Sequence, residues 1–150
     1  PSENDMVDAK EDKQLLLAAV RIAREGQREG NQPYGAVVFR AGQIIAEAYN
    51  SATTGGDHLA HAETKALDSA CRRLGTSSLA DCTLYCTSEP CILCVGAIAW
   101  TGIGRVVYGV ADPIDGAIGE LQTIETIIAT TQLSFAECDA LFAEITQKQR

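Results

Sequence analysis

Residues 82–110, CTLYCTSEPCILCVGAIAWTGIGRVVYGV, are the part of the chain that decides its fold. Residues 82–87 are a short apolar run that is typical of a buried strand, and residues 88–90 break it. A helix is expected from Cys91 to about Trp100, and residues 105–110 form a second, β-branched strand. A strand, a helix and a strand in this order predict two parallel strands joined by a right-handed crossover.

The preceding segments extend this unit into a three-layer α/β/α sandwich. Residues 13–29 have the apolar spacing of an amphipathic helix, and residues 35–40 and 43–49 are typical of the two strands of a hairpin. A polar loop over residues 50–60 leads to a second helix that runs to about Leu74. We therefore expect a five-stranded mixed sheet, an antiparallel hairpin followed by parallel strands, with helices on both faces.

The two ends of the chain complete this plan. Residues 124–131 are rich in Ile and Thr and predict the last strand, with a helix as the alternative. Ser134 and Glu137 have the spacing of a capping box, which predicts the start of the final helix. Residues 1–12 are acidic and polar, so we expect a flexible tail or the lead-in to the first helix. The 150 residues show no repeat or low-complexity linker and predict a single domain.

Composition favours a small-molecule partner. The net charge is −8, from twelve Lys and Arg against twenty Asp and Glu. Affinity for nucleic acid comes largely from basic residues that neutralise phosphates, and here the basic residues form no cluster beyond Arg72-Arg73 and the terminal Lys148 and Arg150. No apolar run approaches the length of a membrane span. Because the N-terminal residues also lack the layout of a secretory signal, we expect a cytoplasmic protein.

Three residues, His61, Cys91 and Cys94, have the types and the spacing of zinc ligands. Cys91 and Cys94 lie one helical turn apart at the start of a helix, so both sulfur atoms point to one side, and free N–H groups there favour the thiolate. A catalytic zinc keeps three protein ligands and an open position for water. Glu63 can reach that open position without being a ligand. We predict one Zn²⁺ ion per chain.

The alternative to an open site is a structural zinc site that catalyses nothing. Such a site needs four protein ligands, and His58 or Cys86 would be the fourth; Glu63 would then be an ordinary acidic residue at a helix N-terminus. Six cysteines would suggest disulfides only in an oxidising setting. The four outside the C-x-x-C unit fall in helix or strand patterns and are expected to be buried apolar residues: Cys71, Cys82, Cys86 and Cys138.

The open arrangement suits hydrolytic removal of an exocyclic amine from an aromatic heterocycle. Zinc lowers the pKa of bound water toward neutrality and so supplies the attacking hydroxide. Glu63 takes the proton of that water, gives it to a ring nitrogen, and later protonates the leaving amine. Partial burial beside the substrate would help the Glu63 carboxyl to hold a proton. The residues thus predict a hydrolase that releases ammonia.

Residues 33–110 resemble the cytidine-deaminase-like superfamily of zinc-dependent nucleobase and nucleoside deaminases. The resemblance rests on three stretches: PYGAVV at residues 33–38, HAE at residues 61–63, and SEPCILCVGAI at residues 88–98. It is strongest toward the branch that holds bacterial guanine deaminases, tRNA adenosine deaminases and fungal cytosine deaminases. The resemblance implies zinc binding by the three predicted ligands, proton transfer by Glu63, and a homodimer.

The resemblance also implies a set of substrate-binding residues. Asn50 matches an Asn that hydrogen-bonds the base, and Trp100 matches a Trp beside the purine in guanine deaminases. Tyr34 would add a second aromatic wall, and Ser88 and Glu89 complete the expected set. The alternatives are a turn residue for Asn50 and core packing at a helix end for Trp100.

We expect a guanine-like nucleobase or nucleoside as the substrate. Two departures from the pattern of guanine deaminases mean that other heterocycles stay alternative substrates. The Phe-Asp-Asp stretch of guanine deaminases is missing, and residues 103–109 resemble tRNA adenosine deaminases instead. Cytosine, cytidine and aminotriazines are therefore alternatives, followed by tRNA adenosine, and the contribution of the C-terminal segment to the pocket is left open. His58 replaces a Pro common in the loop before the zinc His, and we expect a solvated loop residue there, with a pocket wall or a stray ligand as alternatives.

Overall fold

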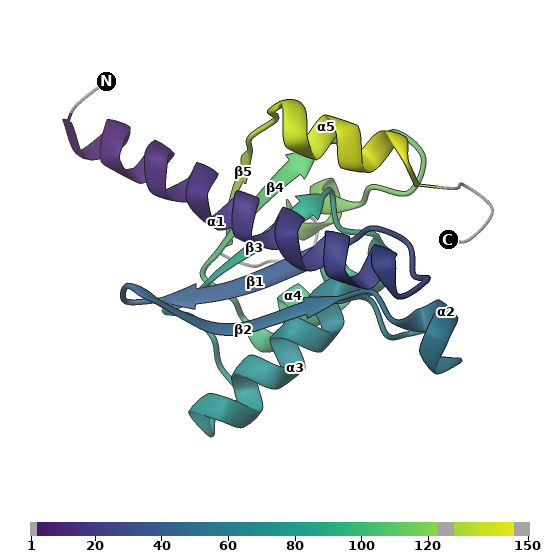
Figure 1. Ribbon diagram of the computed structural model, residues 1–150. Helices are drawn as coiled ribbons and strands as arrows, with labels where there is room; N and C mark the ends of the chain where they lie inside the picture. The colour runs from purple at the N-terminus through teal and green to yellow at the C-terminus, as the bar shows by residue number, and fades with distance from the viewer. Residues whose placement is uncertain (1–2, 123–127, 146–150) are drawn as a thin grey trace.

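The computed structural model describes residues 3–122 and 128–145, which form a five-stranded sheet with helices on both faces (Figure 1). The helices are α1 (Glu3–Arg28), α2 (Ala52–Gly55), α3 (Ala62–Leu74), α4 (Ile92–Thr101), the 3-10 helix η1 (Ile118–Gln122) and α5 (Ala136–Ala143). The strands are β1 (Gly35–Arg40), β2 (Gln43–Tyr49), β3 (Thr83–Ser88), β4 (Arg105–Val110) and β5 (Ala129–Gln132).

The sheet has the strand order β2-β1-β3-β4-β5. The β1–β2 hairpin and the β1–β3 pair are antiparallel, whereas β3–β4 and β4–β5 are parallel. Helices α1 and α5 pack against one face of the sheet and contact each other, while α3 and α4 lie on the other face (Figure 1). This arrangement confirms the predicted three-layer sandwich with an antiparallel hairpin followed by parallel strands.

The central strands β3 and β4 are buried on both faces, which explains their nearly continuous apolar sequence. Leu84, Cys86 and Val106 point into the larger core beneath α3 and α4. Tyr85 and Val107, one residue along each strand, pack with α1 on the opposite face. Helix α4 connects these strands, so the turn between Ser88 and the start of α4 is anchored at both of its ends.

Helix α1 begins ten residues earlier than predicted. The sequence predicted its start at Lys13 with a flexible tail or a lead-in before it, and the structure makes residues 3–12 part of the helix. The structure therefore shows the lead-in alternative for residues 3–12. Asp12, in this part of the helix, is buried against the sheet with an exposed fraction of 5%.

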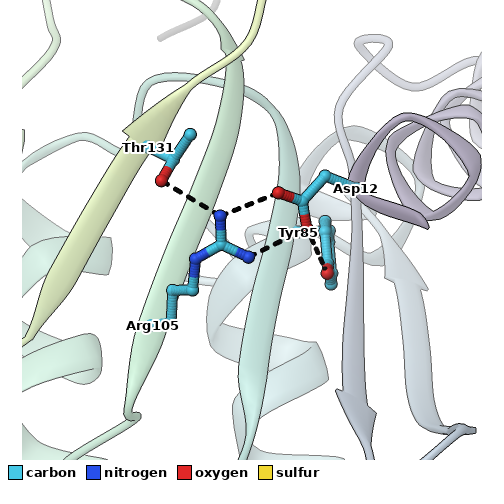
Figure 2. Close-up of polar contacts among 4 residues, drawn as sticks. All are labelled: Asp12, Tyr85, Arg105 and Thr131. Carbon is cyan, nitrogen blue, oxygen red and sulfur yellow. Dashed lines mark hydrogen bonds and ion pairs between the residues drawn. The ribbon is translucent and has the colours of Figure 1, made fainter. Parts of the chain in front are cut away.

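Asp12 accepts hydrogen bonds from two strands (Figure 2). The Arg105 guanidinium donates to both of its carboxylate oxygens, at 2.9 and 2.7 Å, and the Tyr85 hydroxyl donates to one of them at 2.7 Å. Arg105 also donates to the Thr131 hydroxyl at 3.1 Å. One carboxylate thus joins α1 to β3 and β4, and through Arg105 to β5.

Close packing of α1 on the hairpin depends on Gly35, the first residue of β1. A Cβ atom at this position would lie 2.0 Å from the carbonyl oxygen of Ala19 and 2.8 Å from the amide nitrogen of Ala23. Both are backbone atoms of α1, so they cannot move aside without shifting the helix. Glycine therefore lets the helix backbone approach the strand directly.

Three local predictions need correction or lie partly outside the described residues. The expected loop over residues 50–60 contains the short helix α2. Residues 123–127 of the predicted last strand are outside the described part of the chain, and β5 begins at Ala129. The capping box is wrong: Phe135 precedes α5, and the Ser134 hydroxyl instead donates to the carbonyl of Gly109 at 3.2 Å.

None of the helices within the described ranges combines the length and the apolar character that crossing a membrane requires.

Replacing Asp12 with Ala should lower the free energy of unfolding by about 3 kcal/mol, because Arg105 and Tyr85 would lose their shared acceptor. The value lies at the low end for a broken buried pair, since the Arg105 side chain is 33% exposed. Tyr85→Phe removes only one donor and should cost about 1 kcal/mol. Urea denaturation of both variants measures the difference, and equal small losses would show that the network contributes little.

Candidate metal centre and active site

Two helices begin side by side at the carboxyl end of β3. His61 immediately precedes α3 with an extended backbone (φ −76°, ψ 156°), and Cys91 immediately precedes α4 in a similar conformation (φ −77°, ψ 176°). Cys94 lies in the first turn of α4 and is fully buried. Because α3 and α4 pack against each other, these three residues meet at one point.

The three donor atoms form a triangle of the size that zinc requires. Nδ1 of His61 lies 3.5 Å from Sγ of Cys91 and 3.5 Å from Sγ of Cys94, and the two sulfur atoms are 3.8 Å apart. Tetrahedral bonds of about 2.3 Å to sulfur and about 2.0–2.1 Å to nitrogen give separations of about 3.8 Å and 3.6 Å. The donor set and its spacing therefore fit one zinc ion, as predicted.

Protons are shared unequally within this group. The hydrogen bond from Cys94, supported by His61, lowers the pKa of Cys91 to about 3. The same hydrogen bond, together with burial and the nearby Glu63, raises the pKa of Cys94. Binding of a cation by these residues requires both sulfur atoms to lose their protons.

Glu63 occupies the first turn of α3 beside the metal group. The residue is buried, and its Oε2 atom lies 2.7 Å from Sγ of Cys94. Burial raises the pKa of this carboxyl, although the hydrogen bond with Cys94 opposes the shift. A carboxyl in this position can hold a proton and release it next to the metal group.

A cavity of about 480 Å³ opens onto the metal group. Much of its wall comes from the loop that contains α2. Asn50 and His58 of this loop were candidates from the sequence, His58 through its pocket-wall alternative, whereas Ala52, Thr53 and Gly56 were not, because the loop showed only a polar, Gly-containing pattern. The lining residues are Tyr34, Asn50, Ala52, Thr53, Gly56, His58, His61, Ala62, Glu63 and Cys91.

Asn50 lines the cavity and also makes the contact expected of a turn residue. Its side-chain oxygen accepts a hydrogen bond from the backbone N–H of Ala52 at 2.9 Å, as a turn residue would. Its own backbone N–H donates to the carbonyl of Tyr34 at 3.1 Å. With the oxygen engaged, the amide NH₂ of Asn50 is the donor available to a molecule in the cavity.

Three expected substrate-binding residues do not line this cavity. Trp100 is 89% exposed at the end of α4, so neither the pocket role nor the core-packing alternative holds within this chain. Ser88 is buried at the end of β3. Glu89 accepts hydrogen bonds from the backbone N–H groups of Asp112 and Ile118, at 3.0 and 3.2 Å, and so anchors the loop after β4.

The described residues provide no fourth protein ligand for a closed zinc site. Cys86 is fully buried in the core, where its thiol lies 3.8 Å from the carbonyl of Val107. His58 lines the cavity but is not part of the metal group. Among the other cysteines outside the motif, Cys82 and Cys138 are buried as predicted, and Cys71 is partly exposed. The geometry therefore matches the open site and not its structural alternative.

Comparison with known proteins agrees with this geometry. The family described as the cytidine and deoxycytidylate deaminase zinc-binding region matches residues 9–110. The tRNA-specific adenosine deaminase of Bacillus subtilis is 39% identical over 114 residues, which cover 76% of this chain and 71% of that protein. The guanine deaminase of the same organism is 46% identical over 104 residues, covering 69% of this chain and 66% of that protein.

Solved structures share the fold. A chain from a study of A-to-I editing by tRNA:A34 deaminases at the wobble position of transfer RNA has a TM-score of 0.76 at 30% identity, and the match covers 86% of this chain and 99% of that one. A mutant protein solved with 8-azaguanine also has a TM-score of 0.76, at 26% identity, with 89% and 82% covered. This chain therefore belongs to the cytidine and deoxycytidylate deaminase family and is a zinc-dependent, hydrolytic deaminase.

Proposed function

We propose that this deaminase acts on a small amino-substituted heterocycle, with guanine-like purines as the favoured class. The observation that carries the proposal is the lining of the cavity, which includes Tyr34 and Asn50 and, among the residues that the structure describes, no Lys or Arg. A flat ring can pack against the tyrosine while the Asn50 amide donates to the ring edge. Within the described residues, the lining therefore offers no permanent positive charge to the phosphates of an RNA substrate.

The comparisons support a purine as the ring. A guanine deaminase is among the similar proteins, and one solved structure with the same fold holds 8-azaguanine. The similarity to tRNA-specific adenosine deaminases makes tRNA adenosine the second candidate. Against it stands the net charge of −8, which disfavours binding to a polyanion.

In the proposed reaction the protein positions the ring and moves protons. His61, Cys91 and Cys94 would hold a zinc ion, which would supply an activated water. The Glu63 carboxylate accepts a proton from the attacking water and delivers it to the ring nitrogen next to the reacting carbon. Glu63 then takes the remaining proton from the hydroxyl group on that carbon and passes it to the exocyclic amine, so that a C=O bond replaces the C–N bond and ammonia leaves.

We also propose that the protein is a homodimer that associates through α4. Ile92, Gly96 and Trp100 follow one another at helical spacing along its exposed side, where Ile92 is 65% and Trp100 is 89% exposed. A Cβ atom on Gly96 would meet nothing within 4 Å, so packing within the chain does not require glycine there. Glycine inside a helix costs about 1 kcal/mol relative to alanine, and close contact with a second helix would account for it.

An ammonia-release assay over guanine, guanosine, cytosine, cytidine, adenine and aminotriazines tests the substrate. We expect the highest kcat/KM with guanine or a closely related purine. The described lining of the cavity offers the Tyr34 ring for packing and the Asn50 amide as a donor, and it contains no Lys or Arg. A tRNA with adenosine at the wobble position serves as the comparison, assayed for inosine. Inosine formation without ammonia release from any of the small molecules would overturn the proposal in favour of the second candidate.

Glu63→Gln should retain zinc but lower kcat by about 10²–10⁴-fold on the best small substrate, because the amide cannot carry a proton. Metal analysis and steady-state kinetics on the same preparation measure both effects. Cys86→Ala, which changes a buried sulfur outside the metal group, serves as the control and should keep both its zinc and most of its activity. Unchanged turnover in Glu63→Gln would refute the assigned proton transfer.

Trp100→Glu should shift the protein from dimer to monomer in sedimentation velocity at micromolar concentration, because it places a charge on the proposed contact face. Ile44→Glu changes another exposed apolar residue, in β2 and away from α4, and should leave the dimer intact. A monomeric wild-type protein, or equal dissociation by the two variants, would contradict association through α4.

A further inference from the structure

Lys65 reaches from α3 to the two residues that flank Asn50. Its ammonium group donates a hydrogen bond to the backbone carbonyl of Tyr49 at 3.0 Å and another to the hydroxyl of Ser51 at 2.8 Å. The same ammonium lies 5.0 Å from the centre of the Tyr49 ring, within range of a cation–π contact. One side chain therefore holds the chain immediately before and immediately after a residue of the cavity wall.

The contacts of Lys65 are those of a residue that holds the backbone in place. Among the residues that the structure describes, no carboxylate lies within ion-pair distance of its ammonium. Partial burial lowers the pKa of Lys65, so keeping the charged form there carries a cost. A lysine at the surface avoids this cost by extending its ammonium group into the solvent. Here the side chain stays to donate to a carbonyl and a hydroxyl, which fixes their positions.

Other contacts hold this segment as well, beginning with the backbone N–H of Asn50, which donates to the carbonyl of Tyr34 at 3.1 Å. The backbone N–H of Ser51 donates to the carbonyl of Ala60 at 3.1 Å, which closes the base of the loop. At the far end, the side-chain oxygen of Asn31 accepts from the backbone N–H and the hydroxyl of Thr54, at 3.0 and 3.1 Å. Two residues of α3 contact this loop: the Thr64 hydroxyl donates to the carbonyl of Leu59 at 2.9 Å, at the end next to His61, whereas Lys65 holds the end next to Asn50.

Helix α3 also carries His61 at its start and Glu63 in its first turn. A link from α3 to the segment around Asn50 therefore sets the distance between the Asn50 amide and the metal group. A displacement of about 1 Å in such a distance is enough to cost a large factor in rate.

We infer that Lys65 is a positioning residue that holds the Asn50 amide at a fixed distance from the metal group. The inference rests on the proposed function, which assigns Asn50 to the edge of the substrate ring. Lys65 itself does not line the cavity and touches no reacting atom. Its effect on the reaction is therefore expected to pass entirely through Asn50.

The kinetic test is a double-mutant cycle with Lys65→Met and Asn50→Ala on the best substrate of the panel. Methionine keeps most of the length of the side chain but removes every donor, so Lys65→Met alone should lower kcat/KM by about tenfold, mainly through KM, with zinc retained. In the Asn50→Ala background the same change should have little further effect. Lys65→Arg keeps donors and should restore part of the loss. Additive losses would overturn the inference.

Thr54→Ala provides the matched control, because it removes a hydrogen bond from the other end of the same loop. A general loosening of the loop should affect this variant and Lys65→Met alike. A positioning role predicts instead that Thr54→Ala changes kcat/KM little and combines additively with Asn50→Ala. Equal coupling of both variants to Asn50 would count against a specific role for Lys65.

Hydrogen exchange separates failure of this inference from failure of the proposed function, since it needs no substrate. In Lys65→Met, the backbone amides of Asn50, Ser51 and Ala52 should exchange faster than in the wild type, while amides within α3 stay protected. Unchanged exchange at these amides would overturn the positioning role even if the assay panel confirms the substrate. Faster exchange would support it even if the panel shows a different substrate.

Discussion

The active site depends on one constraint, the convergence of three metal-binding side chains on a point between two helix starts. His61 and Cys91 are each the last extended residue before a helix, and Cys94 follows one turn later. In these places the backbone N–H groups lack helical partners and favour nearby thiolates. The helices must begin side by side, which in turn requires the strands that lead into α4 and underlie α3 to be neighbours in the sheet.

The parts of the site differ in how firmly the fold holds them. The turn with Cys91 follows β3, a strand buried on both faces and bounded by two other strands. The wall with Asn50 lies on a loop held by polar contacts, among them those from Lys65 and Asn31. The metal-binding turn thus lies on the more deeply buried part of the fold, and the proposed ring-binding residue lies at the start of a surface loop, where substitutions alter packing least.

Features that depend on local sequence patterns could be predicted from the sequence, and features that depend on contacts between distant residues could not. Strands bounded by turn residues and the metal ligands with fixed spacing were predictable, because both are local patterns. The contact that joins α1 to the sheet was not, since Asp12 meets Arg105, 93 residues away in the chain. The capping box failed for the same reason, because Ser134 bonds to a distant carbonyl. Glu89 lies in the motif, yet its partners are backbone groups of a later loop, which no spacing rule reveals.

X-ray absorption at the zinc edge tests the central claim, an open site with three protein ligands, most directly. The account predicts two sulfur neighbours at about 2.3 Å and two nitrogen or oxygen neighbours at about 2.0–2.1 Å, one from His61 and one from solvent. The spectrum should be unchanged in Cys86→Ala. A third sulfur neighbour, or a sulfur lost in Cys86→Ala, would show a closed structural site and contradict the account.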